Sequence, residues 1–312
     1  MKTKDVLGCV GWAAFFLLAS AWIPFVGPFF SLLTPLPFLY YATKLGLRQG
    51  AVLALLTTLS IGLAAKVGGI PQVTLFCLEF SLLGLVLSEL FRRGFSLGQT
   101  VFFATAFILL VSLGILFFLS LSRDIGPLDM VFKYLEEHIK LTIKSYEHMG
   151  VPQEGSAELE SYAKLFLETV RKIYPSIMII GTGFAVWINV VTARPLFRVG
   201  RIEYPPFVSA DRWKTPDPLV WVVIASGFAL FLTEGSIRFL AVNALIIMMA
   251  IYVFHGLSIL LFFLNKYRVP IWVRVGIYFL IAIQQLFLIL LSLAGLFDQW
   301  IDFRRIYKRA DR

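Results

Sequence analysis

The stretch LDMVFKYLEEHIKLTIKSY, residues 128–146, decides the fold of this chain. Apolar residues recur in it every three or four positions, with Lys and Glu between them, which is typical of an amphipathic helix. A second stretch of this kind follows Ser156, a residue suited to capping a helix N-terminus. Gly150 and Pro152 interrupt the chain between the two stretches. We therefore predict an amphipathic helical hairpin over residues 123–172, with one face buried against a membrane surface or over a cavity mouth.

The sequence on both sides of the hairpin is strongly apolar. The chain has 312 residues, of which 59% are hydrophobic and only 15% are charged, and its mean hydropathy is +0.83. A helix needs about 20 apolar residues to cross a hydrocarbon core roughly 30 Å thick. Nine runs approach that length: 6–23, 25–42, 51–65, 73–91, 101–121, 174–191, 219–233, 239–264 and 271–297. Because the runs are continuous rather than alternating, they exclude a closed barrel. They predict an all-α integral membrane protein, a polytopic bundle of eight or nine transmembrane helices.

This pattern divides the chain into six consecutive segments. They are a five-helix membrane segment (1–122), the hairpin (123–172), a sixth membrane helix (173–192), a basic Pro-rich loop (193–218), C-terminal membrane helices (219–297) and a basic interfacial tail (298–312).

The net charge of +9 does not indicate nucleic-acid binding, because Lys and Arg gather at the ends of the apolar runs. This placement follows the positive-inside rule. It predicts a bacterial cytoplasmic (inner) membrane protein with a cytoplasmic N-terminus and an extracytoplasmic hairpin. Nine crossings would place the basic tail on the side of the hairpin. Either the tail is an exception to the rule, or one segment does not cross, and the short run 219–233 is the favoured candidate.

The first apolar run has two interpretations. Lys2 and Lys4 precede it and Ala19-Ser20-Ala21 resembles a signal-peptide cleavage site. Cleavage would release only the first of many spans, so we favour an uncleaved first helix. Cys9 and Cys77 lie inside apolar runs, and we predict neither a disulfide nor a metal site there.

Two polar residues within the spans are candidate ligand contacts. Glu79 lies midway along the fourth run, where an ionisable group costs about 2.5 kcal/mol or more on insertion scales and faces a cavity or a partner. Asn189 lies in the sixth run. Each either contacts a bound solute or cation, or forms a hydrogen bond that joins two helices, and the sequence leaves both interpretations open.

The basic loop is a candidate docking segment. Arg194, Arg198, Arg201, Arg212 and Lys214 are interleaved there with Pro195, Pro205, Pro206 and Pro216. A basic segment beside a membrane attracts anionic lipid, and a Pro-rich one resists helix formation and suits docking of a partner.

Catalytic motifs are weak in this chain. Residues 94–98, GFSLG, match the G-x-S-x-G pattern, but that chemistry needs a strand-turn-helix context and a histidine base. His138 and His148 are predicted on the opposite side of the membrane, and His255 lies inside a later span. We predict that the chain is not an enzyme, with no catalytic residue, cofactor or metal.

The C-terminal part carries Asn243, His255-Gly256 and the run GLFDQWIDFR at residues 295–304. On these residues the chain resembles the YybS-like family of predicted bacterial inner-membrane proteins, whose function is unknown. The resemblance covers nearly the whole length and its motifs are loose.

The first six spans resemble the substrate-binding component of energy-coupling-factor vitamin transporters. The likeness lies in their number and in a Pro-rich second helix followed by LGLRQG at residues 45–50. That family docks its coupling subunit through an Ala-x-x-x-Ala pattern in the first helix. Here Ala13 and Ala14 are followed four residues on by Leu17 and Leu18, so the pattern is missing and such docking is in doubt.

Two functions remain open on this basis. The first is a transport-related subunit that binds a small solute, with Glu79 and Asn189 as contacts. The alternative is a non-transporting membrane scaffold or assembly factor for envelope or cytoplasmic partners. A polar cavity around Glu79 would favour the first, and a tightly packed bundle with Glu79 paired internally would favour the second. The expected partners are the lipid bilayer, anionic lipid at cytoplasmic loops and a membrane protein, with no nucleic acid.

Overall fold

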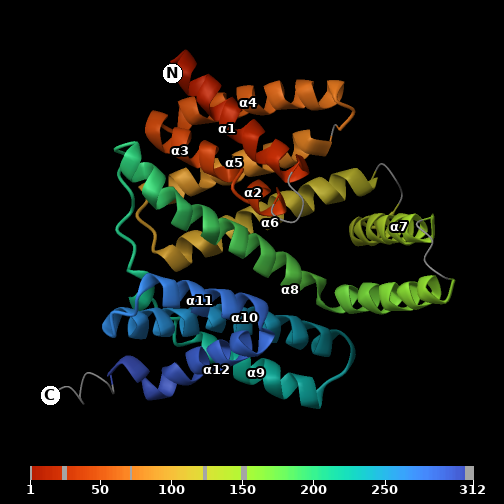
Figure 1. The fold of residues 1–312 in the computed structure, drawn as a ribbon, viewed down its shortest axis with the longest axis vertical. Coiled ribbons are helices and arrows are strands. Elements are labelled where there is room, and N and C mark those ends of the chain that lie inside the picture. The colour runs from red at the N-terminus through yellow and green to blue at the C-terminus, as the bar shows by residue number, and fades with distance from the viewer. Residues whose placement is uncertain (1, 23–26, 71, 122–124, 149–152, 306–312) are drawn as a thin grey trace. The chain divides into compact units, whose positions relative to one another are not determined.

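The computed structural model describes residues 2–22, 27–70, 72–121, 125–148 and 153–305, and every regular element among them is a helix (Figure 1). The elements are α1 (Thr3–Trp22), α2 (Gly27–Ser31), α3 (Pro35–Leu45), α4 (Leu47–Val67), α5 (Gln72–Arg92), α6 (Leu97–Leu121), α7 (Pro127–His148), α8 (Gln153–Val199), the 3₁₀ turn η1 (Ala210–Arg212), α9 (Leu219–Leu232), α10 (Gly235–Lys266), α11 (Ile271–Ile283) and α12 (Gln285–Ile301). Gly150, Pro152 and the tail beyond residue 305 lie outside the described residues.

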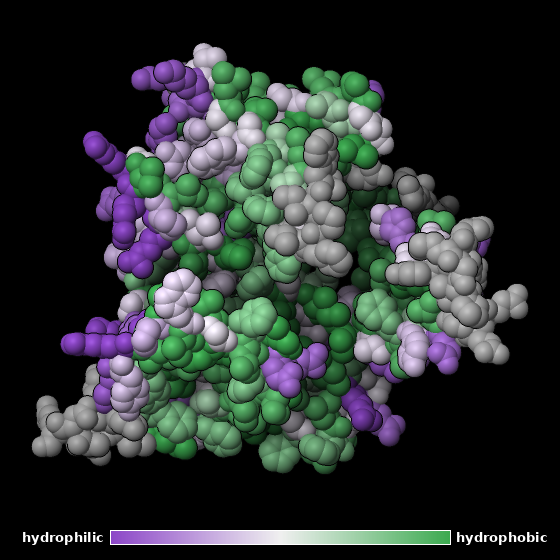
Figure 2. Space-filling model, in the orientation of Figure 1, coloured by the Kyte–Doolittle hydropathy of each residue, from purple (hydrophilic) through white to green (hydrophobic). Residues whose placement is uncertain are grey.

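The predicted all-helical membrane fold is confirmed in its class. Five helices of the described chain are long and apolar enough to cross a membrane: Leu47–Val67, Val73–Arg92, Leu97–Leu121, Glu158–Val199 and Gly235–Lys266. The bent pair α11–α12 raises this number to six if it counts as one span, and α9 is a shorter apolar helix. Hydrophobic residues cover much of the visible face (Figure 2). The count of eight or nine crossings stays a prediction.

The chain forms two compact units, described one at a time below. Unit 1 comprises Met1–Glu137 and Gly181–Phe207, and unit 2 comprises His138–Ile180 and Val208–Arg312.

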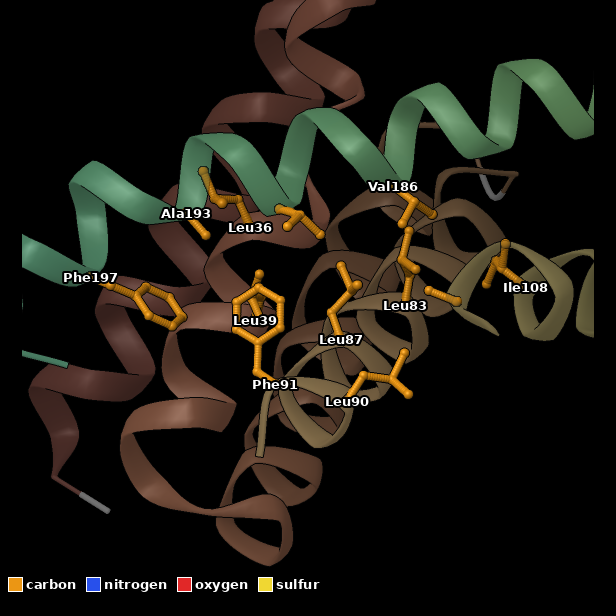
Figure 3. Packing of buried hydrophobic residues seen from close by; sticks show 12 residues of the cluster. Leu36, Leu39, Leu83, Leu87, Leu90, Phe91, Ile108, Val186, Ala193 and Phe197 are labelled. Atoms are coloured by element: carbon orange, nitrogen blue, oxygen red, sulfur yellow. The ribbon is translucent and has the colours of Figure 1, made fainter. Parts of the chain in front are cut away.

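The core of unit 1 lies among α3, α5, α6 and the second half of α8. Leu39, Leu87, Val190 and Phe197 are fully buried there, and the labelled side chains of these helices point toward one another (Figure 3). The ring of Phe91 packs edge-on against that of Phe197, with centroids 5.9 Å apart. Full burial of each such side chain contributes about 1.5–3 kcal/mol in water. In a bilayer the contribution comes from close packing.

Close helix contacts in unit 1 depend on small residues. A Cβ added at Gly50 would lie 2.7 Å from Ala42 Cα, and one at Gly84 would lie 2.7 Å from the Pro35 carbonyl oxygen. The second predicted span is broken, as its prolines indicate: α2 ends at Ser31 and α3 starts at Pro35. Proline lacks the N–H that would continue a helical ladder.

In unit 2, α10 and α12 run parallel and touch along their lengths. The Ser292 hydroxyl donates to the Met249 carbonyl at 2.8 Å, and six residues further along both helices His255 meets Asp298. Their backbones approach closely because a glycine lies at the crossing, where a Cβ added at Gly295 would lie 2.8 Å from the Gly256 nitrogen. Small residues at such crossings allow helices to pack backbone to backbone.

The pair α11–α12 has the geometry of a re-entrant element. The helices bend by 101° at Gln284. At the start of α11, Arg274 donates to Asn265 Oδ1, near the C-terminal end of α10. Just beyond α12, Arg304 donates to the Asp211 carbonyl, while the Asp211 carboxylate accepts from Asn265. Both ends of the pair therefore meet at the same end of α10.

This geometry bears on two expectations. Tail residues 302–305 lie at the same end of unit 2 as loop residues 211–215. The run 271–297 is divided at Gln284, and the choice of 219–233, a short apolar helix, as the segment that does not cross stays a prediction.

Helix α8 joins three of the predicted segments. It runs without interruption from Gln153 to Val199, 47 residues or roughly 70 Å, more than twice the hydrocarbon thickness. Arg194 and Arg198 of the predicted loop belong to its last turns despite Pro195. Proline is tolerated in membrane helices where neighbours satisfy the freed backbone groups.

Candidate functional site

Glu79 joins two helices of unit 1. The Ser112 hydroxyl on α6 donates to Glu79 Oε1 on α5 at 3.0 Å, and both side chains are half-buried. This is the internal pairing that the sequence left as one of two interpretations. A hydroxyl donor lowers the cost of holding a carboxylate at this depth.

Asn189 supports the broken second span. Its side chain is fully buried, and Nδ2 donates to the Leu32 carbonyl at 2.6 Å and to the Ala185 carbonyl at 2.7 Å. Leu32 lies in the turn between α2 and α3, where the proline at 35 starts a new helix. Asn189 therefore satisfies a carbonyl outside the regular ladder. Its Oδ1 has no protein hydrogen-bond partner.

An equivalent asparagine supports α8 in unit 2. Pro175 lacks an N–H, and the next amide, that of Ser176, donates to Asn243 Oδ1 at 3.0 Å. Asn243 Nδ2 in turn donates to the Lys172 carbonyl at 2.9 Å. The Asn243 side chain thus bridges the Ser176 amide and the Lys172 carbonyl. These two groups are four residues apart and would bond directly to each other in a regular helix.

The five basic docking candidates occupy different settings. Arg201 has a positive φ of 52° just beyond α8. Arg212 is exposed in η1, and Lys214 pairs with Asp302 Oδ2 at 3.1 Å. Arg194 and Arg198 lie in the last turns of α8, in unit 1, whereas Arg212 and Lys214 belong to unit 2. Docking by this set stays a prediction.

Tyr204, in the loop beyond α8, packs the start of that loop against α5 and α8 within unit 1. Its hydroxyl donates to the Val190 carbonyl at 2.9 Å, and its ring packs edge-on against Phe91 and Phe197. Burial raises the pKa of Tyr204 to about 12, against the opposing effect of Arg194.

The C-terminal half holds a buried polar cluster that sequence analysis missed. His255 Nε2 lies 3.1 Å from Asp298 Oδ2, and both side chains are almost fully buried. The other oxygen of Asp298 accepts the Phe303 amide at 2.8 Å. Since an ionised carboxylate only accepts hydrogen bonds, Nε2 is the donor in this pair. The signal was a histidine inside the run 239–264 and an aspartate directly after the run 271–297.

Arg304 extends this cluster to the loop. Its guanidinium donates to the Asp211 and Trp213 carbonyls, each at 3.0 Å. The hydroxyl of Ser258 on α10 donates to the same Trp213 carbonyl at 2.8 Å. Burial lowers the pKa of Arg304 from its ordinary value, opposed by nearby Asp298. The loop, α10 and the residues after α12 are therefore held together by polar contacts.

The bend between α11 and α12 presents two glutamines. Gln284 and Gln285 are both exposed, among the exposed apolar residues Leu280, Ile283 and Leu286. Figure 2 shows hydrophilic residues within a hydrophobic surface in this part of unit 2. Gln284 has extended backbone angles, so the helical ladder is interrupted there and some backbone groups are left without partners inside either helix.

The second half of α7 and the first half of α8 line a groove of about 330 Å³. Its lining is apolar apart from two hydroxyl groups, those of Thr142 and Tyr162: Ile139, Thr142, Ile143, Leu159, Tyr162, Ala163 and Phe166. The apolar residues of both helices therefore face this groove, and the predicted hairpin itself stays a prediction.

Among the described residues, no group of three or more His, Cys, Asp or Glu side chains is arranged to hold a metal ion. Cys9 and Cys77 are both free thiols buried in unit 1.

A family model described as predicted membrane protein (DUF2232) matches residues 12–299. The chain belongs to this family. The match spans both units and covers the residues of α2 to α11 and nearly all of α12. No curated protein and no solved structure matched the chain. The resemblances to the YybS-like family and to energy-coupling-factor components stay predictions.

Proposed function

We propose that this DUF2232 protein is a transport-related membrane subunit that binds a small polar solute at the bend between α11 and α12. The observation that carries the proposal is the return of this pair to the end of α10 from which it starts. Discontinuous helices of this kind build binding sites in many transporters.

The position of the α11–α12 bend within the hydrocarbon layer indicates that polar groups or water surround it. Helix α11 has 13 residues, so its far end lies about 20 Å from its start, well inside a hydrocarbon layer roughly 30 Å thick. Irregular backbone at that depth is tolerated where it is buried in protein or lines a water-filled cavity. Gln284 and Gln285 supply amide donors and acceptors at this point.

Contacts between α12 and α10 hold the α11–α12 bend at a fixed position. Gly295 brings α12 against α10, and the His255 and Arg304 contacts fasten its C-terminal end. Preorganised side chains on rigid elements bind at a lower entropic cost than mobile ones. We assign the glutamines the role of solute contacts and retain Glu79 and Asn189 as predicted contacts in unit 1.

Native mass spectrometry in mild detergent tests this function. A small molecule retained by the wild type should be lost in the double variant Gln284→Leu/Gln285→Leu. It should remain in Gln99→Leu, which removes an exposed glutamine at the start of α6. Loss in Glu79→Ala but not in the double variant would move the site to unit 1. Retention in every variant would contradict both assignments.

A second function, a scaffold for membrane or envelope partners, is favoured by a different observation. The contact between Glu79 and Ser112 is internal, as expected for a packed bundle. Helix α8 is also about 40 Å longer than a crossing requires, which suits a projecting hairpin. Co-purification of a defined protein that depends on the hairpin, without any retained solute, would favour this alternative.

For location we propose a bacterial cytoplasmic membrane with the N-terminus inside. In unit 1 the start of α1, the end of α3 and the end of α5 meet, since Lys44 pairs with Asp5 at 2.8 Å and Arg92 donates to the Ala42 carbonyl. Basic residues gathered at one end of a bundle follow the positive-inside rule.

The chain is proposed to act without catalysis or a cofactor.

A further inference from the structure

The end of unit 2 where the loop, the α10–α11 turn and the tail meet carries exposed cations. Arg212, Arg268 and Arg305 are all exposed there. Asn265, three residues before Arg268, contacts Asp211. Arg304, next to Arg305, contacts the same loop. These contacts bring together three arginines that are up to 93 positions apart in the sequence.

The acidic residues at this end leave much of that charge uncompensated. Asp211 accepts from Asn265, Asp302 pairs with Lys214, and Asp298 is buried against His255. Within the part of the loop that belongs to unit 2, residues 208–218, Asp217 is the exposed carboxylate. The hydrogen bond from the Ser209 side chain lowers the pKa of Asp211, so that carboxyl group stays ionised. The guanidinium groups of Arg212, Arg268 and Arg305 are exposed beside these carboxylates.

Exposed aromatic side chains flank the arginines. Trp272 at the start of α11 is 84% exposed, and Trp300 near the end of α12 is 61% exposed. Tyr267 lies in the turn between α10 and α11 and is also exposed. Trp and Tyr at the ends of apolar helices are typical of the headgroup region of a bilayer. Exposed aromatic rings and exposed arginines therefore lie at the same end of unit 2.

We infer that this surface, formed by Arg212, Arg268, Arg305, Trp272 and Trp300, binds the headgroups of anionic phospholipids. Guanidinium groups pair with phosphate oxygens in bidentate geometry, and the indole rings fix the depth at which they do so. The inference does not depend on solute binding at the α11–α12 bend. It differs from the docking segment expected from sequence, since the α10–α11 turn replaces Arg194 and Arg198.

The test uses the full chain in detergent with added phosphatidylglycerol or phosphatidylcholine, followed by native mass spectrometry. We expect phosphatidylglycerol to bind in preference. Its affinity should fall about fivefold in Arg268→Gln and roughly 25-fold in Arg212→Gln/Arg268→Gln, at about 1 kcal/mol for each cation. Arg268→Lys, which keeps the charge, should retain most of the binding.

Arg238→Gln is the matched control. Arg238 is exposed in the first turn of the same helix α10, 28 positions before Lys266, so it lies at the opposite end. Its replacement should leave phosphatidylglycerol binding unchanged. An equal loss in Arg238→Gln, equal binding of phosphatidylcholine by the wild type, or full binding by the double variant would overturn the assignment. Solution size and helix content, compared across variants, identify any that fail to fold.

Discussion

His255 Nε2 and Asp298 Oδ2 lie 3.1 Å apart with both side chains at most 1% exposed, which joins α10 to α12 through a buried polar pair. Asp298→Ala should lower the free energy of unfolding by about 3 kcal/mol or more, because it leaves His255 and Arg304 buried without the carboxylate. Thermal unfolding in detergent measures this effect. Asp302→Asn, which removes the exposed pair with Lys214, should cost less than about 1 kcal/mol, and similar losses in the two variants would contradict the account.

Asn243 and Pro175 should be energetically coupled. Asn243→Ala removes the bridge between the Ser176 amide and the Lys172 carbonyl and should cost about 1–3 kcal/mol. In a Pro175→Ala background the helix regains a backbone donor, so the same change should cost less. A double-mutant cycle by thermal unfolding measures the coupling, expected at about 1 kcal/mol. Strictly additive effects would mean that the amide does not compensate for the proline.

Gly295 should not tolerate a side chain. A Cβ there would meet the backbone of α10, so Gly295→Ala should cost about 1–3 kcal/mol through overpacking. Gly276→Ala on α11, where a Cβ meets nothing within 4 Å, is the matched control and should be neutral or slightly stabilising. The unfolding temperatures of the two variants and the wild type measure this difference. An unchanged unfolding temperature in Gly295→Ala would mean that α10 and α12 are not in backbone contact.

Tyr204 should make stability depend on alkaline pH. Its pKa is raised from 10.0 to about 12 by burial, so the folded state retains the proton that the unfolded chain loses. Stability from this group is complete below pH 10, falls as the pH rises through that range, and is lost beyond the folded pKa. Spectrophotometric titration and unfolding at alkaline pH should show this decline in the wild type and a weaker one in Tyr204→Phe. Identical pH profiles for the wild type and Tyr204→Phe would mean that the Tyr204 phenol is exposed to water in the folded protein.

Local chemistry explains what the sequence predicts well. The break at Pro35 follows from the fixed φ and missing N–H of proline, and the helical conformation of α7 follows from apolar residues at three-and-four spacing. These signals lie within a few residues of the structure that they specify. The continuity of α8 through Pro175 was not foreseen, because the residue that supports it, Asn243, lies 67 positions after Ser176.

The candidate sites depended on long-range contacts that no local pattern encodes. Asn189 was predicted as a ligand contact or a helix link, and its partner at Leu32 lies 157 positions away. The run 271–297 has the composition of one long span, and the neutral pair Gln284-Gln285 near its middle was a weak signal of a break. The return of this run is visible only through contacts such as that of Arg304 with Asp211, 93 positions apart.

The sidedness of the α11–α12 pair is the most direct test of the account. Single cysteines are introduced at Arg212, Ser236 and Arg305 in a chain whose two native cysteines, at positions 9 and 77, are replaced by alanine. Each is labelled with an impermeant thiol reagent in sealed membrane vesicles of either orientation. We predict that positions 212 and 305 label from one side and position 236, at the start of α10, from the other. Labelling of position 305 together with position 236 would show that the pair crosses the membrane once and would contradict the re-entrant geometry.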